Sequence, residues 1–292
     1  MTRPFRFGVA TGNARSRAEW IAKARKVEDL GYATLLVPDH ITTGLAPLTD
    51  LAIAADATTR LRVGSLVFCN DFRHPALLAK EAATLDLLSD GRFELGMGAG
   101  YMPSDYTQAG IPFESPGMRV GRLEEALQVI DRLFSGETVN FAGQYYRITD
   151  LQSRPRPVQQ PRPPIYIGGS GKRLLTIAAR RVESIGIGFM SWGGEMTAVK
   201  PEDIAQKVAW VREAAGDRFD QIELGYTIFQ MNIAERKEQQ ALPLSLHQLS
   251  GSLDQITEEI LARRERYGFS YVQVMEPHME AFAPVVARLA GK

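Results

Sequence analysis

Two neighbouring residues, Asp39 and His40, could carry acid–base chemistry. They follow directly on an apolar run that ends at Pro38. Histidine is the side chain that most readily gains or loses a proton near neutral pH, and an adjacent carboxylate can support its charged form. We therefore take His40 as a candidate proton donor or acceptor, with Asp39 supporting it. A purely structural histidine is the alternative that the sequence leaves open.

A glycine-rich stretch, GRFELGMGAGY at residues 91–101, could hold a flat ligand. Its glycines Gly96, Gly98 and Gly100 stand at every second position of a predicted strand. Glycine weakens a strand interior, so it indicates a bulge, a tight bend or the close approach of a ligand to the main chain. The ligand interpretation makes four residues candidate cofactor contacts: Gly98, Ala99, Gly100 and Tyr101. Close packing of the chain on itself is the alternative.

A second glycine-rich stretch, GGSGK, precedes a predicted helix. Free N–H groups at the start of a helix and the positive end of the helix dipole bind anions such as phosphate. The candidate phosphate contacts are Gly168, Gly169, Ser170, Gly171 and Lys172. A plain left-handed turn is the alternative. A phosphate cradle together with a flat glycine surface suits a flavin-like monophosphate.

Several other kinds of site lack the residues they require. A dinucleotide fingerprint must open a helix, whereas residues 101–113 contain Pro103 and Pro112, show no apolar period and predict a loop. A P-loop needs glycine where Tyr166 stands and Ser or Thr where Arg173 stands. No His, Asp or Glu set has metal-ligand spacing, and no Ser or Cys lies in a nucleophile elbow. Chemistry carried by an organic cofactor is the natural inference.

The composition favours a small-molecule partner. The 292-residue chain has 34 Lys plus Arg against 34 Asp plus Glu, so it has no excess positive charge for nucleic acid or an anionic membrane. A single cysteine, Cys69, excludes internal disulfides, and no long apolar run or cleavable leader is apparent. We expect a soluble, cytoplasmic protein.

The hydrophobic pattern predicts eight strand–helix units. Strands are expected at 5–10, 33–37, 62–68, from 93, and at 165–168, 184–188, 223–229 and 270–275. Helices are expected at 16–30, 48–59, 75–88, 119–134, 172–181, 201–214, 235–248, 253–267 and 277–289. A hairpin at 138–148 and a proline-rich segment form an insertion at about 136–163, after the fourth unit. The count predicts an α/β fold, a (β/α)8 TIM barrel forming one domain over 1–292, with a doubly wound open sheet as the alternative.

In such a barrel the carboxyl ends of all strands converge on one face, where the active site is expected. Met190 and Trp192 end the sixth strand and could form an apolar wall of the substrate site, or a packed lid. His278 follows the last strand and is a weaker candidate for a substrate contact. His74 and His247 lie beside or within predicted helices and are expected to be structural.

Four motifs together resemble a known family: PDH at 38–40, RHP at 73–75, TLDLLSDGRFELGMGAG at 84–100 and PPIYIGGSGKRLL at 163–175. They are similar to the luciferase-like flavin superfamily, in particular its deazaflavin (coenzyme F420)-dependent oxidoreductases of actinobacterial type. The resemblance implies a barrel with an insertion, a homodimer, and a cofactor ring over the barrel mouth with His40 near the reacting atom. It also implies that Phe68, Cys69 and Asn70 carry a bulge, often with a non-prolyl cis peptide, behind the ring.

The resemblance has limits that shape the expected function. Sugar-phosphate dehydrogenases of this family have glutamate and tryptophan where this chain has Tyr101 and Gly44, which argues against that activity. We expect an oxidoreductase that passes a hydride between reduced F420 and an unsaturated or carbonyl-bearing small molecule. An FMN-dependent luciferase-like monooxygenase and a non-catalytic flavin-binding barrel are the alternatives. The loops at 101–116, 190–200 and 230–252 lack a motif that would identify the substrate.

Overall fold

A closed barrel of parallel strands forms the centre of the molecule. The structure is a computed structural model that describes residues 3–188, 200–234 and 245–292. Strand β3 (Arg62–Ser65) pairs with strand β5 (Phe93–Gly98), and this pairing closes the barrel. The predicted (β/α)8 fold is therefore confirmed, and the alternative of an open sheet is wrong. The eight barrel strands are β1 (Arg6–Ala10), β2 (Thr34–Val37), β3 (Arg62–Ser65), β5 (Phe93–Gly98), β8 (Ile165–Gly169), β9 (Ser184–Ile187), β10 (Glu223–Ile228) and β13 (Phe269–Met275).

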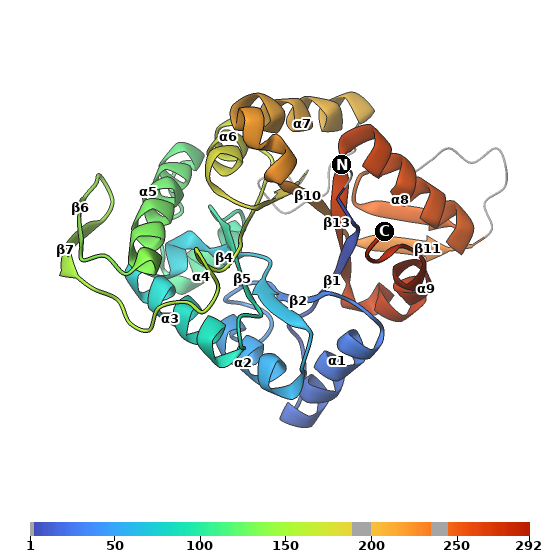
Figure 1. Cartoon of the computed structure of the whole chain (residues 1–292), viewed down its shortest axis with the longest axis horizontal. Helices are drawn as coiled ribbons and strands as arrows, with labels where there is room; N and C mark the ends of the chain where they lie inside the picture. The colour runs from blue at the N-terminus through green and yellow to red at the C-terminus, as the bar shows by residue number, and fades with distance from the viewer. Residues whose placement is uncertain (1–2, 189–199, 235–244) are drawn as a thin grey trace.

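Helices surround the barrel and cover its outer face (Figure 1). Each buries apolar residues toward the strands, as Trp20 and Val27 do from the first helix, which Ser16 caps. None of the helices in the described ranges is both long and apolar enough to cross a membrane. The surrounding helices are α1 (Arg17–Asp29), α2 (Pro47–Ala57), α3 (Pro75–Leu88), α5 (Pro116–Ser135), α6 (Lys172–Arg181), α7 (Pro201–Ala215), α8 (Leu253–Tyr267) and α9 (Met279–Leu289).

The third strand is interrupted. After β3, a non-prolyl cis peptide joins Leu66 to Val67, and the chain resumes as β4 (Phe68–Cys69) alongside β5. A 3-10 helix, η1 (Asn70–Phe72), follows. The expected irregularity is therefore present, but the cis bond lies just before residues 68–70 and not within them. Alternation of apolar residues reports which side of a strand is buried, and it is insensitive to a break of this kind.

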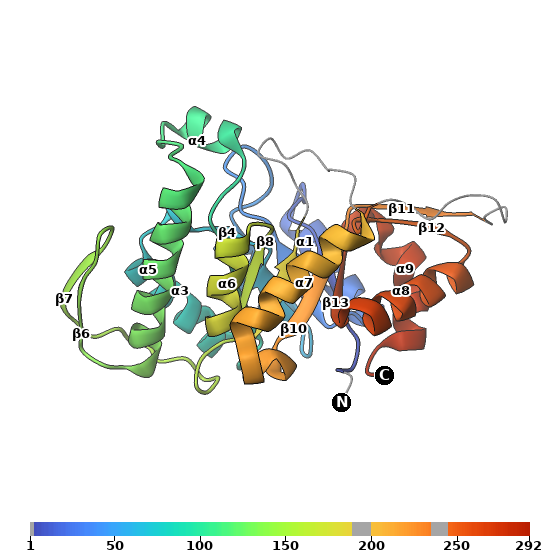
Figure 2. The ribbon, with the colours of Figure 1, turned by 90° about the horizontal axis from the view of Figure 1, so that it is seen from above.

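A short helix, α4 (Pro103–Ala109), stands where we predicted a loop. Pro103 occupies its first turn, where the missing N–H of proline costs nothing, so a proline there does not oppose a helix. Gly110 ends the helix with a left-handed φ of 71°. The helix lies beyond the carboxyl ends of the strands, on the opposite side of the molecule from both chain ends (Figure 2). It therefore overlooks the barrel mouth.

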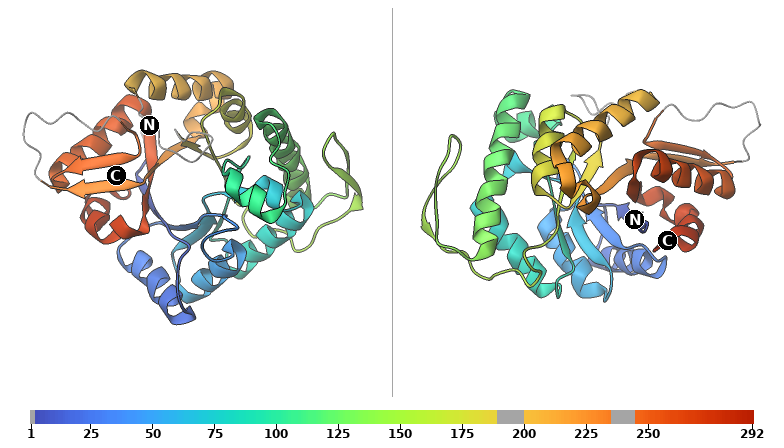
Figure 3. Two further views of the ribbon diagram at one scale, coloured as in Figure 1. Left: turned by 180° about the vertical axis from the view of Figure 1, so that it is seen from behind. Right: turned by 45° about the horizontal axis from the view of Figure 1, so that its top comes forward.

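Two small sheets lie outside the barrel, on opposite sides of it (Figure 3). The predicted hairpin is present as β6 (Val139–Ala142) and β7 (Arg147–Leu151), outside α5. A parallel pair, β11 (Gln230–Ile233) and β12 (Gln248–Gly251), lies beside α8. Of the helix predicted at 235–248, residues 235–244 lie outside the described residues. The prediction is wrong for residues 245–248, because they lead into β12. The remaining 3-10 helices are η2 (Gly216–Gln221) and η3 (Glu276–His278).

A cluster of charged side chains fills the amino-terminal end of the barrel. Glu94 is 4% exposed and pairs with both Arg6 and Arg62. Arg6 also donates to Glu223 at 2.8 Å and lies over the ring of Tyr271, 4.1 Å from its centroid. Because these residues come from five strands at one level, the cluster ties the closed barrel together at the end opposite the candidate site.

Candidate active site

His40 lies beyond the end of β2 and is held by a carboxylate from α4. Its Nδ1 is 2.7 Å from Oδ2 of Asp105. The hydroxyl of Thr42 donates to the other oxygen of Asp105 at 3.0 Å, and the Thr42 amide lies 3.4 Å from it. The Asp105 side chain is 2% exposed, and that of His40 is 23% exposed. A buried carboxylate with three donors therefore fixes the orientation of a partly accessible imidazole.

The surroundings of Asp105 keep it ionised. Burial by itself raises the pKa of this carboxyl group, but hydrogen bonds from His40 and Thr42 outweigh burial and hold the pKa below its ordinary value. An ionised carboxylate accepts only, so Nδ1 of His40 must carry a hydrogen in this contact. The network thereby assigns the Nδ1–H tautomer to neutral His40.

Tyr101, at the end of β5, covers the other imidazole nitrogen. Its hydroxyl lies 3.3 Å from Nε2 of His40, and the two rings meet edge to face with centroids 5.9 Å apart. Burial, helped by the negative charge of Asp105, raises the pKa of the Tyr101 phenol. The hydroxyl therefore keeps its proton at neutral pH. With Asp105 at Nδ1 and Tyr101 at Nε2, both nitrogens of His40 have a partner within the protein.

Asp39 does not support His40 as we expected. Its carboxylate forms a two-point ion pair with Arg73, at 2.5 and 3.1 Å, and accepts the backbone N–H of Cys69 at 2.9 Å. Side chains of consecutive residues in extended chain point to opposite sides, so residues 39 and 40 serve different neighbours. Asp39 therefore fixes the end of β4, and Asp105 has the supporting role at His40 that we expected of Asp39.

The side chains of the three residues after the cis peptide are engaged within the protein. Phe68 is fully buried, and the Arg73 guanidinium lies 4.7 Å from its ring centroid. Burial raises the pKa of Cys69 to about 12, and its Sγ lies 3.1 Å from the Tyr106 hydroxyl. Asn70 donates to the Tyr146 hydroxyl at 3.1 Å. Any contact of Phe68, Cys69 and Asn70 with a cofactor would thus be made by their backbone.

Half-buried side chains at the cis peptide form an apolar floor at the barrel mouth. Leu66 and Val67 pack against a small cluster of buried side chains: Leu36, Tyr166 and Tyr271. A Cβ on Gly98 would lie 2.6 Å from Cγ2 of Val67, and one on Gly168 would lie 3.7 Å from Cγ1. The ends of β5 and β8 therefore have no side chains where Val67 lies between them.

Close packing explains all three alternating glycines. A Cβ on Gly96 would overlap the carbonyl oxygen of Ser65 in β3. Gly98 faces Val67, and a Cβ on Gly100 would overlap the Tyr106 hydroxyl from α4. Gly100 also has a φ of 75°, which disfavours other residues. The packing alternative thus accounts for the pattern, and the cofactor contacts at 98–101 remain predictions.

The segment between β8 and α6 is where we predicted a phosphate site. Gly171 precedes the helix without a side-chain cap, and a Cβ there would meet no atom within 4 Å. Arg173 is used elsewhere, donating to the Gly117 carbonyl at 2.9 Å. A Cβ on Gly169 would lie 2.4 Å from Cδ2 of Leu174, so a side chain here would meet Leu174 and not the space beside the N–H groups. Ser170 is half-buried, and Gly171 and Lys172 are exposed, so these three residues stay open to a ligand, and the phosphate contacts at 168–172 remain predictions.

The remaining predicted residues divide between packing and undescribed chain. Met190 and Trp192 lie outside the described residues. His278 is in η3, where Nε2 lies 3.2 Å from the carbonyl oxygen of Phe229. His74 caps α3, and buried His247 contacts the carbonyl of Thr227 at 2.7 Å, just before β12 and not in a helix. Within the described ranges, no three His, Cys, Asp or Glu side chains gather as metal ligands would.

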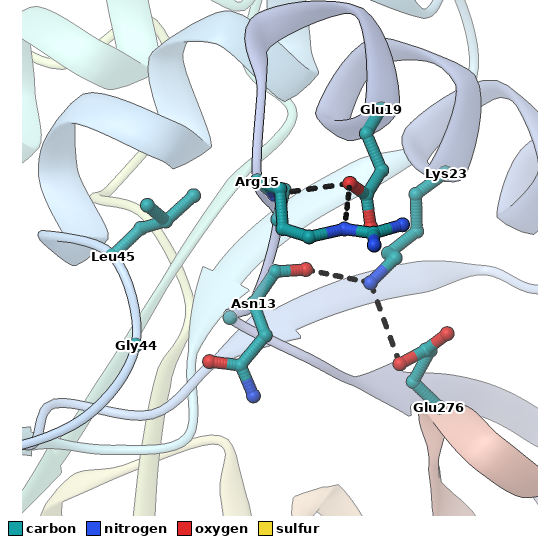
Figure 4. Close-up of a pocket in the computed structure, with 9 residues that line it drawn as sticks. Asn13, Arg15, Glu19, Lys23, Gly44, Leu45 and Glu276 are labelled. Atoms are coloured by element: carbon teal, nitrogen blue, oxygen red, sulfur yellow. Dashed lines mark hydrogen bonds and ion pairs between the residues drawn. The ribbon is translucent and has the colours of Figure 1, made fainter.

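A cavity of about 530 Å³ lies at the rim of the barrel mouth (Figure 4). None of the predicted site residues lines this cavity. It is bounded by α1 and by Gly44 and Leu45, in the loop that continues from His40. Lys23 donates to the Asn13 carbonyl at 2.6 Å and pairs with Glu276 at 3.4 Å across the cavity. The cavity is therefore polar and already internally paired.

Sequence reasoning missed two contributors to the site, Asp105 and Arg73. Pro103 with an acidic residue two positions later, Asp105, is typical of a first helical turn, so the existence of α4 had a local signal. Nothing in the spacing linked Asp105 to His40, which is 65 residues away. Arg73 lay within a quoted motif, but its partner was not evident.

Three comparisons place the chain among known proteins. The profile of a family described as luciferase-like monooxygenase matches residues 1–254. F420-dependent glucose-6-phosphate dehydrogenases of Microbacterium testaceum and Amycolatopsis mediterranei are 32% and 31% identical over 204 and 217 residues. These matches cover 67% and 70% of this chain but 59% and 63% of the relatives, so the chain spans about three fifths of their length. The solved coenzyme F420-dependent tetrahydromethanopterin reductase of Methanopyrus kandleri superposes with a TM-score of 0.80 over 98% of both chains, at 19% identity, which supports the fold alone.

Proposed function

The chain belongs to the luciferase-like monooxygenase family, and we propose that it is an F420-dependent oxidoreductase acting on a small unsaturated or carbonyl-bearing molecule. The observation that carries the proposal is the contact chain Asp105–His40–Tyr101 at the carboxyl ends of the strands. Reduction of a double bond by hydride requires one proton as well, and these three side chains can hold and deliver a proton. The F420-dependent dehydrogenases among its relatives support the choice of cofactor.

The described residues fit a cofactor of this kind in two places. The uncapped start of α6 at Gly171 offers backbone N–H groups to a phosphate, with Ser170 and Lys172 beside them. Val67, lying between Gly98 and Gly168, offers an apolar surface to one face of a ring. When bound, reduced F420 supplies a hydride. The residues of this chain would hold the phosphate, support the ring and manage the accompanying proton.

Binding measurements distinguish F420 from FMN. We expect the purified protein to be largely colourless and to bind F420 with micromolar or tighter affinity, measured by fluorescence quenching. FMN should bind at least about tenfold more weakly, a difference of roughly 1.4 kcal/mol. The family description makes an FMN monooxygenase the second candidate. Stoichiometric yellow FMN after purification, or oxygen-dependent consumption of reduced FMN, would favour that candidate instead.

Turnover tests the activity itself. Reduced F420 should be oxidised steadily in the presence of at least one member of a panel of enones, imines and ketones, and oxidised F420 reduced by a corresponding alcohol. Tight F420 binding without turnover on the whole panel would point to a non-catalytic flavin-binding barrel.

We also propose a homodimer, as the family resemblance implies. Sedimentation velocity would then give twice the chain mass of 32.3 kDa, and a monomer would contradict this proposal.

A further inference from the structure

We propose that the Tyr101 hydroxyl is the group that exchanges the proton with the substrate, and that His40 and Asp105 form a relay behind it. This inference rests on the proposed function and deepens it. Nδ1 of His40 faces Asp105 at 2.7 Å, and Nε2 faces the Tyr101 hydroxyl at 3.3 Å. An imidazole has only these two exchangeable positions. In this geometry a substrate can reach the proton of His40 only through Tyr101.

The backbone that carries Tyr101 is fixed from behind. Arg119, 1% exposed, donates to the carbonyl of Ala99 at 3.0 Å and also to the carbonyl of Gly100. The left-handed φ of Gly100 turns the chain immediately before Tyr101. The tyrosine is half-buried at the carboxyl end of β5, so one side of its ring contacts His40 while part of it remains accessible. Tyr101 is therefore held in place, half-buried, at the end of the barrel where a substrate would bind.

The charged surroundings suit a relay that starts from protonated His40. Asp105 from α4 contacts one side of His40, and Thr42 holds the carboxylate in place. The Asp39–Arg73 ion pair on the neighbouring residue is internally neutralised. A tyrosine alone is a weak acid, and both burial and Asp105 raise the pKa of Tyr101 further. Replacement of its proton from His40 avoids leaving a buried phenolate beside a carboxylate.

In the direction of reduction, the substrate gains one hydride and one proton. The substrate double bond accepts a hydride at one atom, with the cofactor losing two electrons, and accepts the Tyr101 hydroxyl proton at the other atom. Tyr101 oxygen takes the Nε2 proton of His40. Neutral His40 retains its Nδ1–H on Asp105. After the product leaves, Tyr101 returns a proton to Nε2 and takes one from solvent. Oxidation of an alcohol runs the same transfers in reverse.

Tyr101→Phe tests the assignment because it removes the hydroxyl and retains the ring. We expect turnover to fall by about 10²- to 10⁴-fold, with F420 affinity within a few-fold of wild type. In the cofactor-free protein, nitrogen-15 NMR should show a changed Nε2 shift for His40 while the Nδ1–H tautomer persists. Tyr32→Phe is the matched control, since its buried hydroxyl bonds to the Met279 carbonyl outside the site; it should change neither readout.

Each outcome decides the matter. Normal turnover and an unchanged Nε2 signal in Tyr101→Phe would show that His40 meets the substrate directly. If Tyr101→Phe fails to fold, the wild-type protein can be tested instead. A plot of its turnover against the deuterium content of the solvent should be curved, because two protons are in transit. A linear plot would contradict the relay. Failure of the proposed function would look different, since wild type would oxidise no reduced F420 while the NMR contact between Tyr101 and His40 would still be observed.

Discussion

At the scale of single residues, adjacent side chains at the end of β2 have separate tasks. His40 belongs to the proton-handling chain with Asp105 and Tyr101. Asp39 belongs to a structural contact with Arg73 and the Cys69 amide. A change at either residue would lower activity, but through different causes. Measurements of activity and of stability together can separate them.

For His40, the expected defect is catalytic. His40→Ala should lower turnover by about 10²- to 10⁴-fold and leave F420 affinity within a few-fold, because the ring and phosphate would be held chiefly by backbone and apolar surface. Steady-state kinetics and fluorescence titration measure the two quantities. Near-normal turnover would remove His40 from the proton path.

For Asp39, the expected defect is in stability. Asp39→Ala leaves the Arg73 guanidinium, whose side chain is 18% exposed, without its carboxylate and leaves the Cys69 amide without an acceptor. Loss of one partner of a largely buried pair costs about 3 kcal/mol of unfolding free energy, measured by urea denaturation. A fully stable variant with lost turnover would instead return Asp39 to the catalytic group.

At the scale of elements, short segments that break the βα rhythm build the site. The interruption between β3 and β4 brings Val67 against the ends of β5 and β8. The short helix α4 carries Asp105 over the barrel mouth, and its buried Tyr106 anchors it through Cys69 and Asp71, each 3.1 Å from the hydroxyl. The regular helices around the barrel contribute mainly the start of α6.

The start of α6 offers a substitution that separates stability from binding. Gly171 has φ −81°, which any residue accepts, and open space beside it. Gly171→Asp supplies the missing N-cap, so unfolding free energy should stay level or rise by up to about 1 kcal/mol. The same carboxylate would occupy and repel a phosphate site, so F420 affinity should fall more than about tenfold.

Gly171→Ser provides the matched control, because it caps the helix without adding charge. It should weaken F420 binding less than the aspartate does. Unchanged affinity in Gly171→Asp, measured by fluorescence titration, would locate the phosphate elsewhere on the barrel face.

At the scale of the whole molecule, stability and chemistry lie at opposite ends of the barrel. The cluster around Glu94 closes the amino-terminal end, and the proton-handling chain lies at the carboxyl ends. Burial by itself raises the pKa of Glu94, but attraction to Arg6 and Arg62 outweighs burial and lowers the pKa. Because the folded-state pKa is lowered, the cluster stabilises the fold above the ordinary glutamate pKa of about 4.3, and this contribution is lost as pH falls below it.

Glu94→Gln should therefore destabilise the protein in a pH-dependent way. At pH 7 we expect a loss of about 3 kcal/mol of unfolding free energy, because two arginines keep their burial but lose their shared charge partner. The difference from wild type should shrink as pH falls through the range in which wild-type Glu94 gains its proton. Glu280→Gln, which removes an exposed pair with Lys26, should change urea denaturation little at any pH. Equal effects of both variants would contradict the importance of the cluster.

The sequence by itself determined the regular architecture. Alternating and helical periods predicted eight strand–helix units and the hairpin after the fourth, because periodicity directly records which side of an element is buried. It also placed His40, the glycines and the proposed phosphate site at strand ends. Those features depend on residues close together in the chain, where spacing carries the information.

Only the tertiary structure decided which side chains meet at the barrel mouth. Asp105 reaches His40 from 65 residues away, Asp39 turns to Arg73, and Tyr106 occupies the space that Gly100 leaves open. These contacts join loops and a short helix that are far apart in the chain, so no spacing in the sequence encodes them. Packing of α4 over the closed barrel brings Asp105 to His40 beside Tyr101, and the proton path follows from that placement.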